Sequence, residues 1–241
     1  MGVLLDFPQA LAERRQHAIF SDFTDDYVST SWVSTLTDSG TAGVGDAAGG
    51  IMALVASDGT VADNDEAYLE SPNETFLFAN NKPLLFEARI QFTEANTDDA
   101  NIIVGMKDAV AADTLLDNGG GPAASYTGAV FFKVDGGTNW QFETSISGAQ
   151  TTTDLTAANA NNLSKVVQTA GGASYQTLRI SFEPYSSTAA KVNGFIDGVH
   201  VVSHDFTYTS ATEMQLCAGV KNGGANVETL NIDYMGGWQL R

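Results

Sequence analysis

The run Leu84-Leu-Phe-Glu-Ala-Arg-Ile-Gln-Phe92 decides the fold class, because apolar and polar side chains alternate along it. Every second residue from Phe86 to Phe92 is apolar, and the residues between them are charged or polar. A period of two indicates a β-strand with one face on a core and the other face in water. The strand belongs to an antiparallel sheet, since strands of a parallel sheet read as continuous apolar runs.

Similar runs recur along the chain from Ile51 onward, separated by Gly, Asn and Asp. The predicted strands cover residues 51–55, 75–78, 84–92, 101–106, 129–134, 140–146, 176–183, 191–196, 199–202, 214–220 and 228–238. Many short strands at regular spacing predict an all-β protein, an antiparallel β-sandwich. We predict one such domain over residues 21–241.

Composition excludes several classes of partner. The chain carries 29 acidic residues against 11 basic ones, a net charge of −18, which disfavours binding to nucleic acid or to an anionic membrane. No apolar run approaches the roughly 20 residues of a membrane-spanning helix. The start of the chain lacks a basic region and soon reaches Pro8, so we expect no signal peptide and synthesis in a cytoplasm. The single cysteine, Cys217, lies in an apolar run and is predicted to be a buried, inert thiol.

Residues 1–20 differ from the rest and predict a short N-terminal arm or helix. Phe7, Leu11, Arg14 and Arg15 have a spacing that suits an amphipathic segment. Two interpretations are open, a solvated terminal arm and an anchor that docks on a partner. In the second, apolar burial supplies the binding free energy and the arginines set the register.

The sequence offers no recognisable catalytic constellation. Hydrolysis of a glycoside needs two carboxylates roughly 5–10 Å apart. No predicted strand carries two acids on one face: Glu87, Glu143 and Asp233 each lack an acid two residues further on. The Glu-x-Asp-x-x-Glu run of sandwich hydrolases and a Gly-x-Ser-x-Gly nucleophile turn are also absent. We predict that the protein is not an enzyme, with no catalytic residue and no cofactor.

Metal binding has weak support. Calcium could use the oxygen atoms of Asp63-Asn-Asp-Glu66 or of residues 98–101, but neither fits the spacing of a twelve-residue calcium loop. Neighbouring carboxylates arise by chance in so acidic a chain, and residues 63–66 are predicted to form a solvated loop. His200 is predicted to face solvent, and its spacing to His204 would suit a metal only on a helix. We therefore predict no metal ligands.

Large aromatic residues leave two interpretations open. They are either part of the core or stack on sugars from an exposed face. The residues concerned are Trp32, Tyr126, Trp140 and Tyr208. The second interpretation describes a carbohydrate-binding module.

Three segments resemble elements of concanavalin-like or laminin-G-like jelly rolls. Phe86–Phe92 resembles a central strand, Lys191–Val201 a strand-turn-strand hairpin around Asp197-Gly198, and Asn231–Tyr234 a closing strand. This resemblance implies a fold and not a function.

A second resemblance extends over nearly the whole chain. The segments that carry it are Asp6–Phe23, Asp46–Gly50, Asp63–Asp65, Val130–Gly136 and Asp197–His200. They resemble a family of tailed-bacteriophage head proteins. The resemblance implies a structural component of the virion, a decoration protein on the capsid exterior. Its implied partner is the major capsid protein, on which it would form a homo-oligomer, with Phe7, Leu11, Arg14 and Arg15 as anchor. The alternative is a carbohydrate-binding jelly-roll module that serves in attachment.

Overall fold

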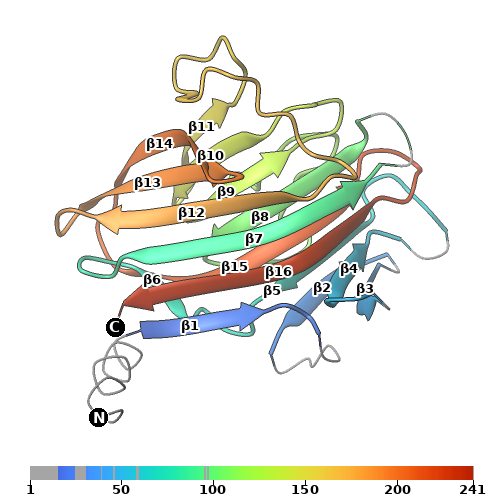
Figure 1. The fold of residues 1–241 in the computed structure, drawn as a ribbon, viewed down its shortest axis with the longest axis horizontal. Helices are drawn as coiled ribbons and strands as arrows, with labels where there is room; N and C mark the ends of the chain where they lie inside the picture. The colour runs from blue at the N-terminus through green and yellow to red at the C-terminus, as the bar shows by residue number, and fades with distance from the viewer. Residues whose placement is uncertain are drawn as a thin grey trace, which may run out of the picture.

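The structure is a computed structural model that describes residues 16–24, 31–38, 40–45, 47–57, 60–94, 96 and 98–240. Two antiparallel sheets pack face to face in this part of the chain, which contains no α-helix (Figure 1). The predicted all-β antiparallel sandwich is confirmed. Among the described residues, no helix has the length and apolarity needed to cross a membrane.

The first sheet has eight strands. In spatial order they are β14 (Val199–Thr207), β13 (Ala189–Ile196), β12 (Gln176–Pro184), β7 (Leu84–Thr93), β16 (Thr229–Leu240), β4 (Ile51–Val55) and β3 (Thr41–Gly45), and β1 (Gln16–Ser21) also pairs with β16. All neighbouring strands in this sheet are antiparallel.

The second sheet also has eight strands. Their order is β11 (Ala149–Asp154), β10 (Gln141–Ile146), β9 (Gly128–Lys133), β8 (Ala100–Lys107), β15 (Thr212–Asn222), β5 (Glu66–Glu70) and β2 (Val33–Thr37), and the short β6 (Phe76–Phe78) pairs with β15. The predicted strands all have counterparts in the two sheets, but β1, β2, β3, β5 and β11 were not predicted.

The predicted turn at Asp197-Gly198 joins β13 to β14. Ile196 pairs directly with Val199, so the loop between the two strands has two residues. Both loop residues have positive φ, 49° and 79°. This is the backbone of a type I′ turn, whose twist matches that of the flanking strands, and Asp-Gly is a preferred sequence for it.

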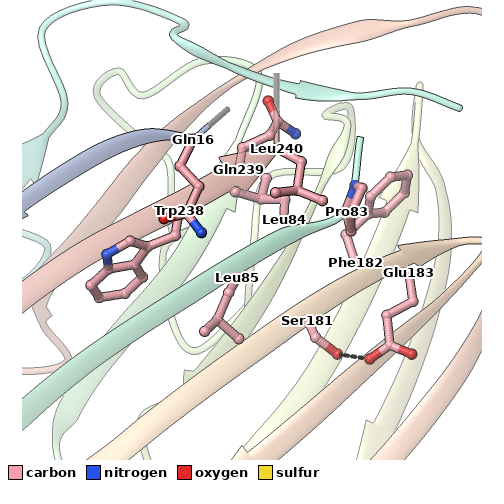
Figure 2. A pocket seen from close by; sticks show the side chains of 10 residues that line it. All are labelled: Gln16, Pro83, Leu84, Leu85, Ser181, Phe182, Glu183, Trp238, Gln239 and Leu240. Atoms are coloured by element: carbon pink, nitrogen blue, oxygen red, sulfur yellow. Dashed lines mark hydrogen bonds between the residues drawn. The ribbon is translucent and has the colours of Figure 1, made fainter. Parts of the chain in front are cut away.

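The N-terminal strand β1 corrects one expectation. The helical pattern predicted up to Phe20 does not hold over residues 16–20, which pair with β16 from Gln16↔Leu240 to Ser21↔Met235. The strand is favoured because Ile19 packs against the core while Phe20 lies on the outer face. Gln16, at the start of β1, borders a hollow on the outer face of the first sheet (Figure 2).

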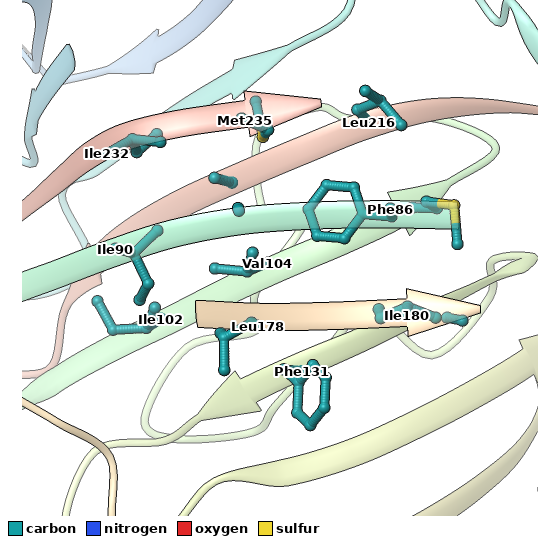
Figure 3. Close-up of a cluster of buried hydrophobic side chains, with 14 of the residues drawn as sticks. Phe86, Ile90, Ile102, Val104, Phe131, Leu178, Ile180, Leu216, Ile232 and Met235 are labelled. Carbon is teal, nitrogen blue, oxygen red and sulfur yellow. The ribbon is translucent and has the colours of Figure 1, made fainter. Parts of the chain in front are cut away.

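The core lies between the two sheets and explains why these runs form strands. Along β7, residues at every second position from Leu84 to Phe92 are buried, with intermediate exposure for the residues between them. Facing side chains from both sheets interdigitate there, including Phe86 and Ile180 from the first and Val104 and Phe131 from the second (Figure 3). Each large apolar side chain that is fully buried contributes roughly 1.5–3 kcal/mol.

Candidate functional site

The outer face of the second sheet is covered by the segment from residue 108 to residue 127. A small apolar cluster lies between them, formed by Tyr68, Ile103, Leu115, Tyr126, Val130 and Phe132. The ring of Tyr68 lies directly on Gly219, where an added Cβ would come within 1.9 Å of Tyr68 Cδ1. Glycine at this position therefore lets the ring lie flat on the sheet under the covering segment.

Lys221 holds the covering segment in place. Its side chain is 1% exposed, and its ammonium group lies 3.3 Å from Glu66, 2.8 Å from Asp113 and 2.6 Å from Asp117. It also donates a hydrogen bond to the carbonyl of Leu115. Burial alone would lower the pKa of Lys221, but hydrogen bonds to the two aspartates raise it above its ordinary value. The lysine therefore stays charged and links strand β15 to the covering segment through its ion pairs with Asp113 and Asp117.

Glu66 is the carboxylate beneath that lysine, and it corrects the prediction of a solvated loop. Asp65 and Glu66 are each 1% exposed. Glu66 accepts hydrogen bonds from the Tyr68 hydroxyl at 2.7 Å and from the Asp113 backbone at 2.9 Å. Because Glu66 and Glu70 are four residues apart on β5, they share its outer face, so the expectation that no strand carries two acids on one face is wrong.

Glu70 is a buried carboxyl group with one oxygen unused. It is 6% exposed, and its Oε1 accepts a hydrogen bond from the Thr35 hydroxyl. Its Oε2 has no hydrogen-bond partner among the residues that the structure describes. Burial raises the pKa of Glu70 to about 7, although the hydrogen bond from Thr35 acts in the opposite direction. Its register neighbour on β15 is Cys217, which is fully buried as predicted. Burial raises the pKa of that thiol to about 12, so the thiolate is disfavoured.

A pocket of about 220 Å³ opens beside the covering segment, over the far end of the sheet. The glycine-rich stretch 119–122 forms one side. The other side is lined by outward residues of three adjacent strands: Phe132 and Val134 from β9 and the loop after it, Gln141 and Glu143 from β10, and Gln150 and Thr152 from β11. Two amides, a hydroxyl group and a carboxylate therefore meet over one aromatic ring.

Glu143 fixes the positions of the polar side chains around the pocket through three hydrogen bonds. It is 4% exposed, and its Oε1 accepts hydrogen bonds from the Tyr126 hydroxyl at 2.8 Å and from the Gln150 amide at 2.9 Å. Its Oε2 accepts a hydrogen bond from the Thr152 hydroxyl. These hydrogen bonds hold both side chains of β11, and within the described residues Gln150 Oε1 and the lone pairs of the Thr152 hydroxyl oxygen accept no hydrogen bond.

Tyr126 and Lys107 lie next to Glu143 on the buried side of the pocket: Tyr126 donates a hydrogen bond to Glu143, and Lys107 lies over the Tyr126 ring. Burial, together with the neighbouring Glu143 carboxylate, raises the pKa of Tyr126 far above its ordinary value, so the phenol stays a neutral donor. The Lys107 ammonium lies 4.7 Å from the centre of the Tyr126 ring. Burial lowers the pKa of Lys107, while the carboxylates of Asp108 and Glu143 act to raise it. A cation over the ring face stabilises the arrangement.

The aromatic residues singled out in the sequence belong to the interior. Trp140 is fully buried, and Trp32, Tyr126 and Tyr208 are each 3% exposed. They are therefore not the rings on which a sugar could stack. Phe20 is an exposed aromatic residue that sequence reasoning did not single out.

The residues considered as metal ligands in the sequence do not form a metal site in the described part of the chain. Within the described residues, no group of three or more His, Cys, Asp or Glu side chains could hold a metal ion. His200 is exposed, as predicted, and stacks on Phe195. His204 is buried between the sheets, where its ring nitrogens lie 3.0 Å from the Thr144 hydroxyl and 2.9 Å from that of Thr153. Phe7, Leu11, Arg14 and Arg15, the predicted anchor, lie outside the described residues.

Comparisons with known proteins bear on the fold. No protein-family model matches the chain, and no curated protein matches its sequence significantly. Among solved structures, the Emp47p carbohydrate recognition domain is 12% identical and has a TM-score of 0.57, with 93% of this chain and 95% of that chain covered. The β-glucanase of Bacillus licheniformis is also 12% identical and has a TM-score of 0.57, with coverages of 93% and 98%.

A third solved structure is the legume lectin-like domain from Entamoeba histolytica. It is 7% identical and has a TM-score of 0.53, with 85% of this chain and 88% of that chain covered. The protein therefore has the concanavalin-like jelly-roll fold predicted from its hairpin and strand segments. At these identities the likeness is one of fold alone, which lectins and glycan-cleaving enzymes share.

Sequence reasoning found only part of this pocket. Glu143 was noted as an isolated acid, but Gln150 and Thr152 were not identified because the Thr-rich stretch 149–154 lacks apolar alternation. One signal was present: Ser147-Gly148 lies between Ile146 and Ala149, and both turn residues have positive φ, as in a two-residue hairpin. That hairpin places β11 beside β10 and completes the pocket.

Proposed function

We propose that the protein is a non-catalytic carbohydrate-binding module whose ligand occupies the Glu143 pocket. The observation that supports this most directly is the set of paired polar groups around Glu143, held by hydrogen bonds above the Phe132 ring. A sugar hydroxyl both donates and accepts hydrogen bonds, so it suits the free acceptors of Gln150 and Thr152 and the amide of Gln141. A volume of about 220 Å³ is below that of typical drug-sized sites, so it suits one sugar ring.

The state of Glu143 argues for binding and against hydrolysis. Its carboxylate already accepts three hydrogen bonds, from Tyr126, Gln150 and Thr152, and it is the one carboxylate among the described residues that line the pocket. Glu70 is on β5, four strand spacings from β10 in the order β10-β9-β8-β15-β5, so the two are separated by about 19 Å. That exceeds the roughly 5–10 Å of a glycosidase pair, so Glu70 cannot act with Glu143; the nearer carboxylate is Asp154, the diagonal neighbour of Glu143 on β11, and the activity test below addresses it.

The binding proposal is tested by calorimetric titration of neutral mono- and oligosaccharides. Glu143→Gln is expected to weaken binding at least about tenfold, which corresponds to about 1.4 kcal/mol, because an amide group cannot accept all three hydrogen bonds. Thr152→Val, at an exposed position, removes one ligand contact and is expected to weaken binding as well. Glu183→Gln, on the outer face of the other sheet, is the matched control and should bind as the wild type does. Equal affinity for all four proteins would contradict the assignment of this pocket.

The proposal of a non-enzymatic role has its own test. Incubation with a panel of polysaccharides is expected to release no reducing ends. If the protein did hydrolyse a glycoside, Asp154 would be the candidate second carboxylate. It pairs with Gln141 and therefore lies diagonally across from Glu143 on the β10–β11 pair. Release that Asp154→Asn or Glu143→Gln abolishes would show that the protein is a hydrolase.

A place on a phage particle is a second proposal, supported by the sequence resemblance. In that proposal the protein decorates the capsid exterior, is bound to the major capsid protein as a homo-oligomer, and is anchored by the segment with Phe7, Leu11, Arg14 and Arg15. An acidic, disulfide-free sandwich suits an outer surface assembled in a cytoplasm. Quantitative mass spectrometry of virions should find a fixed, symmetric ratio to the major capsid protein. Absence from particles, or only a few copies per particle, would contradict decoration.

A further inference from the structure

Strand β1 is an uncharged edge in a strongly acidic protein. The residues Gln16–Ser21 include no Asp, Glu, Lys or Arg, whereas the whole chain has a net charge of −18. β1 pairs with β16 on one side and, within the described ranges, with no strand on the other. Exposed strand edges normally carry charges, prolines or bulges that prevent pairing with another chain. β1 has none of these protections.

One end of β1 carries an exposed aromatic ring. Phe20 is 53% exposed, and its ring centre lies 5.9 Å from the ring centres of Tyr234 and Trp238. Its register partner on β16 is Gly236, where an added Cβ would come within 2.9 Å of Phe20 Cδ2. The glycine therefore lets the Phe20 ring settle on the sheet between the two larger rings, with half its surface presented outward.

The other end of β1 borders an apolar hollow. Gln16 lines a pocket of about 240 Å³ together with Leu85, Trp238 and Leu240 (Figure 2). Ser181 and Glu183 close its far side, where the serine donates a hydrogen bond to the carboxylate. An exposed aromatic ring and an apolar hollow thus lie at opposite ends of one unprotected edge. Such an edge is complementary to a copy of itself turned by 180°.

We propose that two copies of this chain pair antiparallel through β1, about a two-fold axis at Ala18, to join their first sheets. Directly opposed residues of an antiparallel pair share a face of the sheet, so the outward residues Gln16, Ala18 and Phe20 of one copy must oppose outward residues of the other. The Ala18↔Ala18 register places Phe20 of each copy opposite Gln16 of its partner, at the rim of the partner's hollow. The contact is isologous and closes as a dimer.

Charge makes the salt dependence of this dimer a specific expectation. Each copy carries a net charge of −18, so the two bodies repel one another while their contact strands are uncharged. Salt screens that repulsion over the Debye length, which falls from about 30 Å at 0.01 M to about 8 Å at 0.15 M ionic strength. Dimerisation should therefore strengthen as salt is added, the reverse of an interface held by ion pairs.

The first experiment is sedimentation equilibrium of the full chain at low and physiological ionic strength. The wild type should be a dimer that tightens with salt, and Phe20→Asp should weaken it at least about tenfold by placing two charges at the contact. Val199→Asp is the matched control, since Val199 is 52% exposed on β14 at the opposite edge of the same sheet, and it should leave the dimer intact. A monomeric wild type, or an unchanged Phe20→Asp dimer, would overturn the proposal.

The second experiment tests the register without depending on a charged substitution. Because Cys217 is buried, Ala18→Cys introduces a single accessible thiol next to the two-fold axis. Opposed Cα atoms in an antiparallel pair are about 4.5–5.5 Å apart, within the span of a disulfide. Mild oxidation should give a covalent dimer of Ala18→Cys and not of Val199→Cys. Failure of Ala18→Cys to cross-link, or equal cross-linking of both variants, would overturn the register and with it the proposed axis.

Discussion

Lys221→Met is expected to lower the free energy of unfolding by about 3–5 kcal/mol, since it leaves a buried carboxylate without its cation. Lys221 and Glu66 are 1% and 2% exposed, so water cannot replace the lost partner. Asp113 and Asp117 lose the same cation, and these residues belong to the segment that covers the second sheet. We therefore expect that segment to become sensitive to proteases under conditions in which the sandwich remains folded.

Denaturant titration measures the loss, and two further variants make it specific. Lys191→Met removes an ion pair with Asp205 in which both side chains are exposed, so it should change stability by no more than about 1 kcal/mol. Adding Glu66→Gln to Lys221→Met removes the buried charge and should recover part of the loss. If Lys221→Met is as stable and as protease-resistant as the wild type, the covering segment is held by its apolar contacts and not by the lysine.

Several of the strands found from the sequence have a clear alternation of apolar and polar residues. β7 and β12 were identified because buried Leu, Ile, Phe or Ala alternate with polar or charged residues along most of their length, with Leu85 as an apolar outward exception. The β13–β14 hairpin was identified from Asp197-Gly198, a dipeptide with few alternatives to a tight turn. In these places local preference and tertiary burial agree, so the sequence alone suffices.

The strands that were missed are formed by tertiary context. β11 reads Ala-Gln-Thr-Thr-Thr-Asp, and only Thr153 among its residues is buried. β1 lies in the stretch predicted as an arm or helix because Phe7, Leu11, Arg14 and Arg15 suit an amphipathic spacing, whereas pairing with β16 determines the backbone of residues 16–21. Such an edge strand gains its hydrogen bonds from a neighbour more than two hundred residues away. The local sequence of β1 contains no pattern from which this pairing with β16 could be predicted.

The candidate site was harder to predict than the fold for a related reason. Asn64, with φ of 71°, is a turn residue, so the prediction of a loop at residues 63–66 holds up to Asp65, but Asp65 is already buried and not solvated. The strand nevertheless begins at Glu66, and this puts Glu66 and Glu70 beneath other chain segments. Glu66 pairs with Lys221 and Glu70 accepts a hydrogen bond from Thr35. Neither contact can be predicted from the positions of these residues in the sequence.

Glu70→Gln is expected to raise the free energy of unfolding at pH 8 by about 3 kcal/mol and to leave it nearly unchanged at pH 4. The pKa of Glu70 is raised from 4.5 to about 7 by burial, and each pKa unit corresponds to about 1.4 kcal/mol. Below pH 4.5 the carboxyl is protonated in both folded and unfolded chains, so it costs nothing. Between pH 4.5 and 7 the unfolded chain releases the proton and the folded chain keeps it, so stability falls as pH rises.

Above pH 7 the buried carboxylate is ionised while one oxygen, Oε2, has no donor in the described part of the chain, so the full desolvation penalty applies. Glutamine resembles the protonated acid at every pH, so the difference between the two proteins should grow between pH 4.5 and 7 and then level off. His204 affects the pH dependence of stability in the opposite direction, and equally in wild type and variant. Burial lowers its pKa from 6.5 to about 4, so stability is lost as pH falls from 6.5 to about 4. Taking the difference between the two proteins removes this contribution.

Unfolding in urea at several pH values between 4 and 8 measures this difference directly. Glu74→Gln, at an exposed position, is the control and should follow the wild type at every pH. A Glu70→Gln variant that is no more stable than the wild type at pH 8 would mean that the ionised carboxylate is solvated or paired. The strand β2, whose Thr35 donates a hydrogen bond to the Glu70 carboxylate, would then be the place to look for an opening that admits water.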